Sequence, residues 1–300
     1  MSKATVGGQA VIEGVMMRGS KGTATAVRLP DGKIEISTEK TVSVTKKISV
    51  LGLPIIRGFV SLIESLIIGM KAIEYSASFF EDDDSPSKFD KWFEKTFKDK
   101  GSKIIMGISL ALSLVLSVAL FFILPTVLAS LIKKYITSSV LVLNIFEGII
   151  RVAIFLSYVF FIGKMDDIHR LYQYHGAEHK TIFCYENGEE LTPANAKKYG
   201  RLHPRCGTNF LFLVMVISII IFSFTGWKSV TQRIISRVVL LPLVSGVTYE
   251  VIRWLGKSNS RISKIIAWPG LLLQKITTKE PDESMLEVAI ASLKAAEGLD

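Results

Sequence analysis

Histidine and cysteine are scarce in this chain: its 300 residues include only four histidines and two cysteines. The chain has no internal repeat, no low-complexity segment and no nucleic-acid-binding motif. Residues 1–19 lack a cationic region followed by a continuous apolar core, so no secretory signal peptide is expected there. Because no nucleic-acid motif accounts for the net charge of +9, this charge favours contact with anionic lipid headgroups.

Apolar residues, in contrast, are abundant. They make up 49% of the chain, and the mean hydropathy of +0.39 is too high for an ordinary soluble domain of this length. Runs long enough to cross a hydrocarbon core of about 30 Å occupy residues 104–132, 140–163, 209–226 and 234–255. This pattern predicts an α-helical integral membrane protein with about four transmembrane helices, a small N-terminal antiparallel β element and a cytoplasmic His/Cys-rich loop.

Residues 50–80 form a further apolar run that carries four charges. Arg57, Glu64, Lys71 and Glu74 recur at intervals of seven and three, which keeps the charges on one face of a helix. We interpret the run as an amphipathic helix that lies in the membrane interface or packs against the bundle. A fifth span is the alternative.

The rest of the chain divides into short regions of distinct character. Residues 1–46 alternate between apolar and polar positions, with Asp31-Gly32 as a hairpin signal, and predict the β element. Residues 81–103 read as a charged connector between the amphipathic helix and the first span. Residues 256–300 read as an interfacial segment, because Trp268 is of a type that favours the headgroup level, followed by a short amphipathic helix over residues 281–299.

The distribution of lysine and arginine predicts the orientation of the spans. With four spans, the N-terminal region, the loop of residues 164–208 and the C-terminal tail share one side and hold most of the 36 basic residues. We therefore expect a multi-pass protein of the bacterial plasma membrane with these regions in the cytoplasm. In that reducing compartment, Cys184 and Cys206 are expected to be thiols or metal ligands and not a disulfide.

All four histidines and both cysteines lie close together, between residues 169 and 206. At the centre is an H-x-x-E-H pattern of His175, Glu178 and His179, which a helix would place on one face through i, i+3 and i+4 spacing. The pattern inverts the zinc-protease motif, in which two histidines bind zinc and the glutamate acts as general base. Ordinary hydrogen-bonded polar residues on a helix face are the alternative.

A second group, His203-Pro204-Arg205-Cys206, follows in the same loop. It supplies an imidazole and a thiol, and nitrogen and sulfur ligands together suit zinc. Cys206 is expected at a helix N-terminus, where the helix dipole lowers the pKa of a thiol. A small apolar residue at the membrane edge is the alternative interpretation. Cys184 is interpreted as a packed core residue and His169 as a surface residue.

Charged residues in or near the apolar runs are a further class of candidates, because a charge in the membrane is costly unless it is paired or faces a cavity. Glu147 and Arg151 are i, i+4 partners in the second span, and Glu250 and Arg253 are i, i+3 partners in the fourth. Glu250 is a candidate metal ligand, and an ion pair between helices is its alternative role. Glu13, an acid inside an apolar N-terminal strand, is a candidate catalytic residue or the partner of an arginine.

Five segments resemble a known family. They are GGQAVIEGVMMRG at residues 7–19, YHGAEHKTI at 174–182, HPRCGTNFL at 203–211, YEVIR at 249–253 and PGLLLQKITTKEPDESMLEVAIASL at 269–293. These segments are similar to the YqhQ-like family of bacterial membrane proteins of unknown function, which is described as a predicted metal-dependent enzyme. The resemblance covers nearly the whole chain and implies a membrane location and a metal, without implying a reaction.

These observations predict an integral membrane metal-dependent hydrolase with a divalent metal as its cofactor, and the donor types favour zinc. His175, His179 and either His203 or Cys206 would hold the metal, with Glu250 as a further candidate ligand; Glu178 would be the general base and Glu13 a second catalytic candidate. The expected substrate is lipid-derived or membrane-proximal, and a homo-oligomer or a membrane protein partner is compatible with the pattern. The alternatives are a non-catalytic scaffold or assembly factor with a closed four-ligand site of His175, His179, His203 and Cys206, and a transporter with Glu147, Arg151 and Glu250 along a polar path.

Overall fold

The computed structural model describes residues 6–41, 43–80, 101–135, 139–224, 229–258 and 260–299. Most of the predicted charged connector, residues 81–100, therefore lies outside the described residues. Strands β1 (Gly7–Val11), β2 (Gly14–Arg18), β3 (Thr23–Arg28) and β4 (Ile34–Glu39) form one antiparallel sheet in the order β1-β2-β3-β4. The predicted N-terminal β element is confirmed, and the Asp31-Gly32 hairpin joins β3 to β4, with Gly32 at a φ of 86° that favours glycine.

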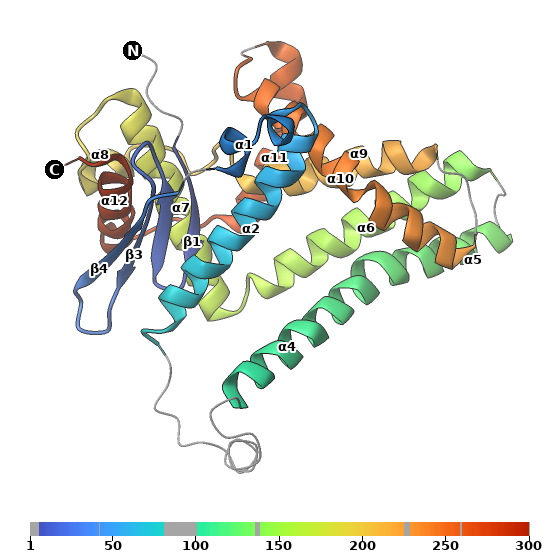
Figure 1. Cartoon of the computed structure of the whole chain (residues 1–300), viewed down its shortest axis with the longest axis horizontal. Helices are drawn as coiled ribbons and strands as arrows, with labels where there is room; N and C mark the ends of the chain where they lie inside the picture. The colour runs from blue at the N-terminus through green and yellow to red at the C-terminus, as the bar shows by residue number, and fades with distance from the viewer. Residues whose placement is uncertain are drawn as a thin grey trace.

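Helices cover both faces of this sheet (Figure 1). Val15, Met17 and Ala24 point to one face and pack against α7 (Asp166–Asn187) and α12 (Glu283–Glu297). Val11 and Met16 point to the other face and pack against α2 (Ile56–Ala77). Strand residues alternate between the two faces, so a sheet enclosed in this way needs apolar or small residues at nearly every position of β2 and β3.

The predicted amphipathic run of residues 50–80 contains α2 and most of the short 3-10 helix η1 (Ser49–Gly52). Besides the sheet, α2 packs against α10 (Val230–Leu255), and the two helices meet closely at Gly58 and Gly246. The short helix α1 (Val44–Lys47) precedes them. α2 thus packs against the bundle, and it is not among the helices of the described chain that are long and apolar enough to cross a membrane.

Three stretches of the described chain are helical, long and apolar enough to cross a membrane: Gly107–Leu131, Val140–Ile162 and Thr231–Leu255. The first runs through α4 (Gly101–Val118), a π-helical turn η3 (Ala119–Ile123) and α5 (Leu124–Tyr135). The second is α6 and the third lies in α10. These helices indicate a membrane protein. They agree with three of the four predicted spans, whereas the remaining one, residues 209–226, corresponds to the shorter apolar helix α9 (Gly207–Ser223).

The sheet and its covering helices lie at one end of the apolar helices (Figure 1). α6 ends at Ile162 and α7 begins at Asp166, so the second long helix leads directly into the helix that carries the H-x-x-E-H pattern. The opposite end of the bundle holds the ends of α5 and α9 and the beginnings of α6 and α10.

Two further helices complete the arrangement around α7. α11 (Arg261–Thr277) packs against α9 and leads into α12, and the short α8 (Pro193–Lys197) packs against α7 and α12. The predicted C-terminal helix of residues 281–299 is confirmed as α12, which begins after the N-cap Asp282. Its apolar face, including Leu286 and Leu293, is buried on the sheet, so this helix is part of the hydrophobic core.

Candidate metal centre

The helix α7 places His175, Glu178 and His179 on one face, as their i, i+3 and i+4 spacing predicts, and both of its ends are well defined. Asp166 and Asp167 lie in its first turn, where acidic side chains are favourable, and Gly188 ends it in the left-handed conformation. The middle of α7 is buried, and Gly176 lets the main chain of residues 277–281 approach closely. A β-carbon at Gly176 would lie 2.1 Å from the carbonyl oxygen of Lys279.

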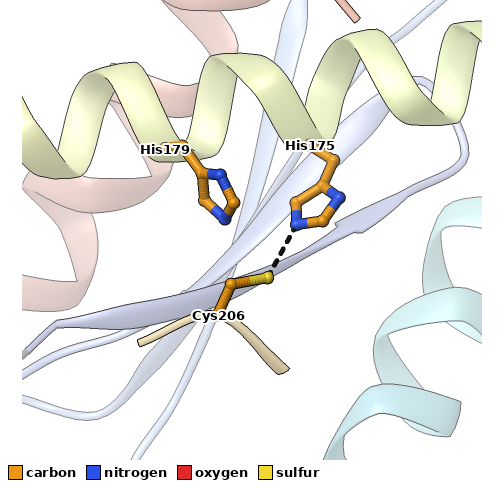
Figure 2. A group of neighbouring side chains, drawn as sticks. All are labelled: His175, His179 and Cys206. Atoms are coloured by element: carbon orange, nitrogen blue, oxygen red, sulfur yellow. Dashed lines mark hydrogen bonds between the residues drawn. The ribbon is translucent and has the colours of Figure 1, made fainter. Parts of the chain in front are cut away.

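Three side chains meet on this face: His175, His179 and Cys206 (Figure 2). Their donor atoms all lie within 4.8 Å of one another, which is close enough for one metal ion to contact all three. The Nε2 atom of His175 is 3.1 Å from the sulfur of Cys206. We call this group the His₂Cys cluster.

Cys206 reaches the cluster from a helix end, as the sequence predicts. It is the N-cap of α9, and its sulfur accepts hydrogen bonds from the backbone N–H of Thr208 at 3.4 Å and from the Thr208 hydroxyl at 3.3 Å. Burial raises the pKa of the Cys206 thiol, but the neighbouring His179 imidazole and the two Thr208 donors outweigh the effect of burial, so the pKa is lowered overall. A thiol of this kind is a suitable precursor of a metal-binding thiolate.

Main-chain carbonyl groups orient both imidazoles of the cluster. The Nδ1–H of His175 donates to the carbonyl oxygen of Thr277 at 2.9 Å, and the Nδ1–H of His179 donates to that of Arg201 at 2.5 Å. With the proton on Nδ1, each ring directs the lone pair of Nε2 toward the cluster. The Nε2 atom of His179 is buried and has no hydrogen-bond partner among the described residues. Metal-binding histidines usually donate their other ring N–H to a carbonyl or carboxylate group in this way.

Glu178 lies next to the cluster and is buried against strand β1. The main chain of Gly8 contacts its carboxyl group, and a β-carbon at Gly8 would come within 3.0 Å of the carboxyl carbon. Its Oε2 atom has no hydrogen-bond partner within the described part of the chain. Burial raises the pKa of Glu178 to about 8. The carboxyl oxygens are not among the donors that the His₂Cys cluster brings together.

His203 is adjacent to the cluster, but its nitrogens have other neighbours. Nδ1 accepts the backbone N–H of Arg205 at 3.3 Å, and Nε2 is 3.6 Å from a carboxylate oxygen of Glu186, which also pairs with the Arg205 guanidinium. Its ring centroid is 5.6 Å from that of His179. Burial lowers the pKa of His203 to about 4, so the imidazole is neutral.

The two other acidic candidates lie apart from the His₂Cys cluster. Glu250 pairs with Arg57 of α2, through Nε at 2.7 Å and a second nitrogen at 2.5 Å, which is the ion pair between helices given above as its alternative role. Glu13 occupies the β1–β2 turn with a φ of 48° and pairs with Arg170 of α7. It also accepts the hydroxyl of Tyr174 at 3.2 Å. Both carboxylates thus have arginine partners.

The positions of His169 and Cys184 agree with their interpretation as a surface residue and a core residue. His169 is exposed on the first turns of α7, and Cys184 is fully buried in the core between the sheet and α12. The metal role of each candidate residue stays a prediction, but the structure brings together His175, His179 and Cys206 and leaves His203, Glu250 and Glu13 with other contacts.

Several groups that shape the centre carry no sequence signal. Gln274 of α11 accepts the His203 backbone N–H at 2.7 Å and donates to the His203 carbonyl at 2.8 Å, which anchors the loop ahead of Cys206. The carbonyls of Thr277 and Arg201 are main-chain groups, so their residue types reveal nothing of their role. Gly176, Gln274 and Thr277 lie inside segments that resemble the known family, but nothing in those segments predicts these contacts.

The fold and the site define a helical, membrane-type protein with a small enclosed sheet and a His₂Cys donor group at the end of the bundle. The chain belongs to the family described as "Protein of unknown function (DUF1385)", whose model matches residues 53–298. It is 34% identical over 296 residues to "Uncharacterized protein YqhQ" of Bacillus subtilis (strain 168), an alignment that covers 95% of this chain and 90% of the relative. The resemblance to a YqhQ-like family of unknown function is therefore confirmed. No solved structure matches the chain.

Proposed function

We propose that this protein is a membrane-embedded, metal-dependent hydrolase in which His175, His179 and Cys206 hold a zinc ion. The observation that carries the proposal is the orientation of the two imidazoles. Each Nδ1 is engaged by a main-chain carbonyl, and each Nε2 is directed toward the same thiol. The Nε2 atom of His179, buried without a hydrogen-bond partner in the described residues, is costly unless a ligand satisfies it.

The donor set favours zinc and an open coordination position. Two imidazoles and one thiol are borderline-soft ligands, which suit Zn²⁺ better than Mg²⁺ or Ca²⁺. Structural zinc sites have four protein ligands, whereas catalytic sites have three and leave the fourth position open. The geometry of His203 supports the three-ligand arrangement, because its ring nitrogens face Arg205 and Glu186.

Glu178 is the residue best placed to move a proton. When bound, zinc supplies Lewis acidity, which polarises a carbonyl or phosphoryl oxygen of a substrate and acidifies water. Without the metal, burial keeps the Glu178 carboxyl group mostly protonated at neutral pH, and the positive charge of a bound zinc ion would lower its pKa. The carboxylate would then take the proton from the attacking water and return it to the leaving group. Gly8 holds the carboxyl group against β1, and burial keeps bulk water from competing for the proton.

The place of the centre in the fold supports a substrate from the membrane. Cys206 begins the apolar helix α9, and α7 follows directly on α6, so the cluster lies where two apolar helices end. We propose four spans, with α9 as the short third one, and a plasma-membrane topology that places the sheet, α7 and the C-terminal tail in the cytoplasm. A lipid-derived or membrane-proximal substrate then reaches the centre from the bilayer edge.

Metal analysis of the purified protein tests this proposal. We expect about one zinc per chain after chelator-free purification in detergent, because a His₂Cys set binds zinc tightly. His179→Ala and Cys206→Ser should lose the metal, while Glu178→Gln and His203→Gln should keep it. His169→Gln is the matched control, since it removes an exposed histidine of the same helix.

Two outcomes would count against the proposal. Absence of stoichiometric metal in the wild-type protein would exclude a metalloenzyme. Loss of metal in His203→Gln, with folding intact by circular dichroism, would point to a closed four-ligand site and hence to a metal-stabilised scaffold.

A further inference from the structure

A buried lysine follows directly after the H-x-x-E-H pattern. Lys180 lies on α7 next to His179, and only 4% of its surface is exposed. Lysine is almost never buried to this extent unless its charge is paired, because moving an ammonium group out of water is costly. The partners of Lys180 therefore show what the buried charge does in this fold.

The ammonium group of Lys180 has three partners. Its Nζ atom donates to the carbonyl oxygens of Lys197 at 3.1 Å and of Tyr199 at 2.8 Å. It also forms an ion pair with Oε1 of Glu280 at 2.6 Å. An ammonium group has three N–H donors, so these three acceptors satisfy it completely. Lys180 thus holds three groups of the protein together and has no further donor to offer to a substrate.

The two carbonyl partners belong to the loop that orients His179. Lys197 ends α8, and Tyr199 lies two residues before Arg201, whose carbonyl oxygen accepts the Nδ1–H of His179. Residues 198–206 form neither helix nor strand, so contacts with other segments must fix the position of the Arg201 carbonyl. The two hydrogen bonds from the Lys180 ammonium group are such contacts.

The third partner belongs to the segment that orients His175. Glu280 lies three residues after Thr277, whose carbonyl oxygen accepts the Nδ1–H of His175 at 2.9 Å. The second carboxylate oxygen of Glu280 is 3.6 Å from the Arg201 guanidinium group. Lys180 and Glu280 therefore join the two segments whose carbonyl groups orient the two imidazoles.

We propose that Lys180 is a positioning residue of the metal centre. It acts through the carbonyl groups of Arg201 and Thr277, because its bonds keep the two segments that carry them in one arrangement. Groups that orient metal-binding histidines typically change metal affinity by about 10–100-fold when they are lost. This inference rests on zinc binding by the His₂Cys cluster, as proposed above, and not on hydrolysis.

Zinc affinity and the spectrum of bound cobalt test the inference. Lys180→Met keeps an unbranched side chain and removes all three donors. We expect its zinc affinity, measured in detergent by competition with a chelator, to fall by about 100-fold. Cobalt bound in place of zinc reports its coordination geometry through visible absorption bands, which should shift in this variant at saturating cobalt. A lysine that only stabilised the fold would lower the Tm of the metal-free protein and leave the spectrum unchanged.

Two further variants complete the test. Lys197→Met is the matched control, because the Lys197 ammonium group pairs with Glu283 at the surface and the variant retains the Lys197 carbonyl. Its zinc affinity and cobalt spectrum should equal those of the wild type. Glu280→Ala removes a carboxylate whose side chain is 60% exposed, so this variant should fold even if Lys180→Met does not. Its zinc affinity should fall by about tenfold.

The outcomes separate this inference from the proposed function. Unchanged zinc affinity or an unchanged cobalt spectrum in folded Lys180→Met would overturn the positioning role and leave the metal centre in place. If Lys180→Met does not fold, unchanged affinity in Glu280→Ala would overturn that role instead. A wild-type protein that binds neither zinc nor cobalt would overturn the metal centre itself, and the role of Lys180 with it.

Discussion

Replacing Gly176 with alanine is expected to destabilise the protein and to abolish the proposed metal binding at the same time. The new β-carbon would lie 2.1 Å from the carbonyl oxygen of Lys279, so α7 and the segment that follows α11 must move apart. This segment holds α7 through the hydrogen bond from the Lys279 N–H to the carbonyl of Tyr172 at 2.8 Å, and it orients His175 through the carbonyl of Thr277. Overpacking of this kind costs about 1–3 kcal/mol.

Thermal unfolding and zinc content, measured on the same preparation, check this prediction. The Tm should fall by about 2–10 °C, and zinc content should fall well below that of the wild type. Gly107→Ala is the matched control, because Gly107 is also helical and has open space where a β-carbon would lie. A Gly176→Ala variant with unchanged Tm and full metal would show that the 277–281 segment is not needed to orient His175.

Replacing Glu147 with leucine is expected to have the largest effect on stability of any single substitution in the bundle. The variant leaves Arg151, Arg233 and Arg237 without their shared carboxylate, and the three guanidinium groups repel one another in a buried position. Removing one partner of a buried ion pair costs about 3–5 kcal/mol. The amount of folded protein in membranes and the Tm in detergent should both drop sharply.

Glu250→Gln provides the comparison for this variant. Its ion pair with Arg57 is partly exposed, with side-chain exposed fractions of 25% for Arg57 and 28% for Glu250, so the loss should be below about 1 kcal/mol. Zinc content should be unchanged in both variants, because neither residue contacts the His₂Cys cluster. If Glu147→Leu is as stable as Glu250→Gln, the arginines are compensated by other groups.

Much of the fold could be predicted from local patterns. The alternating residues and the Asp31-Gly32 turn predict the N-terminal sheet, because a tight turn and an alternation of period two leave few other arrangements. The helix around His175 and the helix end at Cys206 are likewise local properties. The length and apolarity of residues 140–163 predict a long helix without knowledge of its neighbours.

The packing of α2 and α12 could not be predicted in the same way. Both read as amphipathic helices, and an amphipathic face shows that a helix is partly buried without showing against what. In the structure, α2 covers one face of the sheet and α12 the other, which makes both of them parts of a soluble-type core at the end of the bundle. The partners are distant in sequence, since β2 and α12 are separated by most of the chain.

The candidate site also combines features that the sequence predicts with features that only the structure shows. The sequence by itself determined that His175, Glu178 and His179 share a helix face, because helical spacing is a one-dimensional property. It left open whether His203 or Cys206 joins the two histidines. Only the tertiary structure decided which side chain turns inward, through Gln274 anchoring the His203 main chain and Glu186 facing its ring. Main-chain carbonyls and contacts between distant segments set such orientations, and no residue pattern along the chain encodes them.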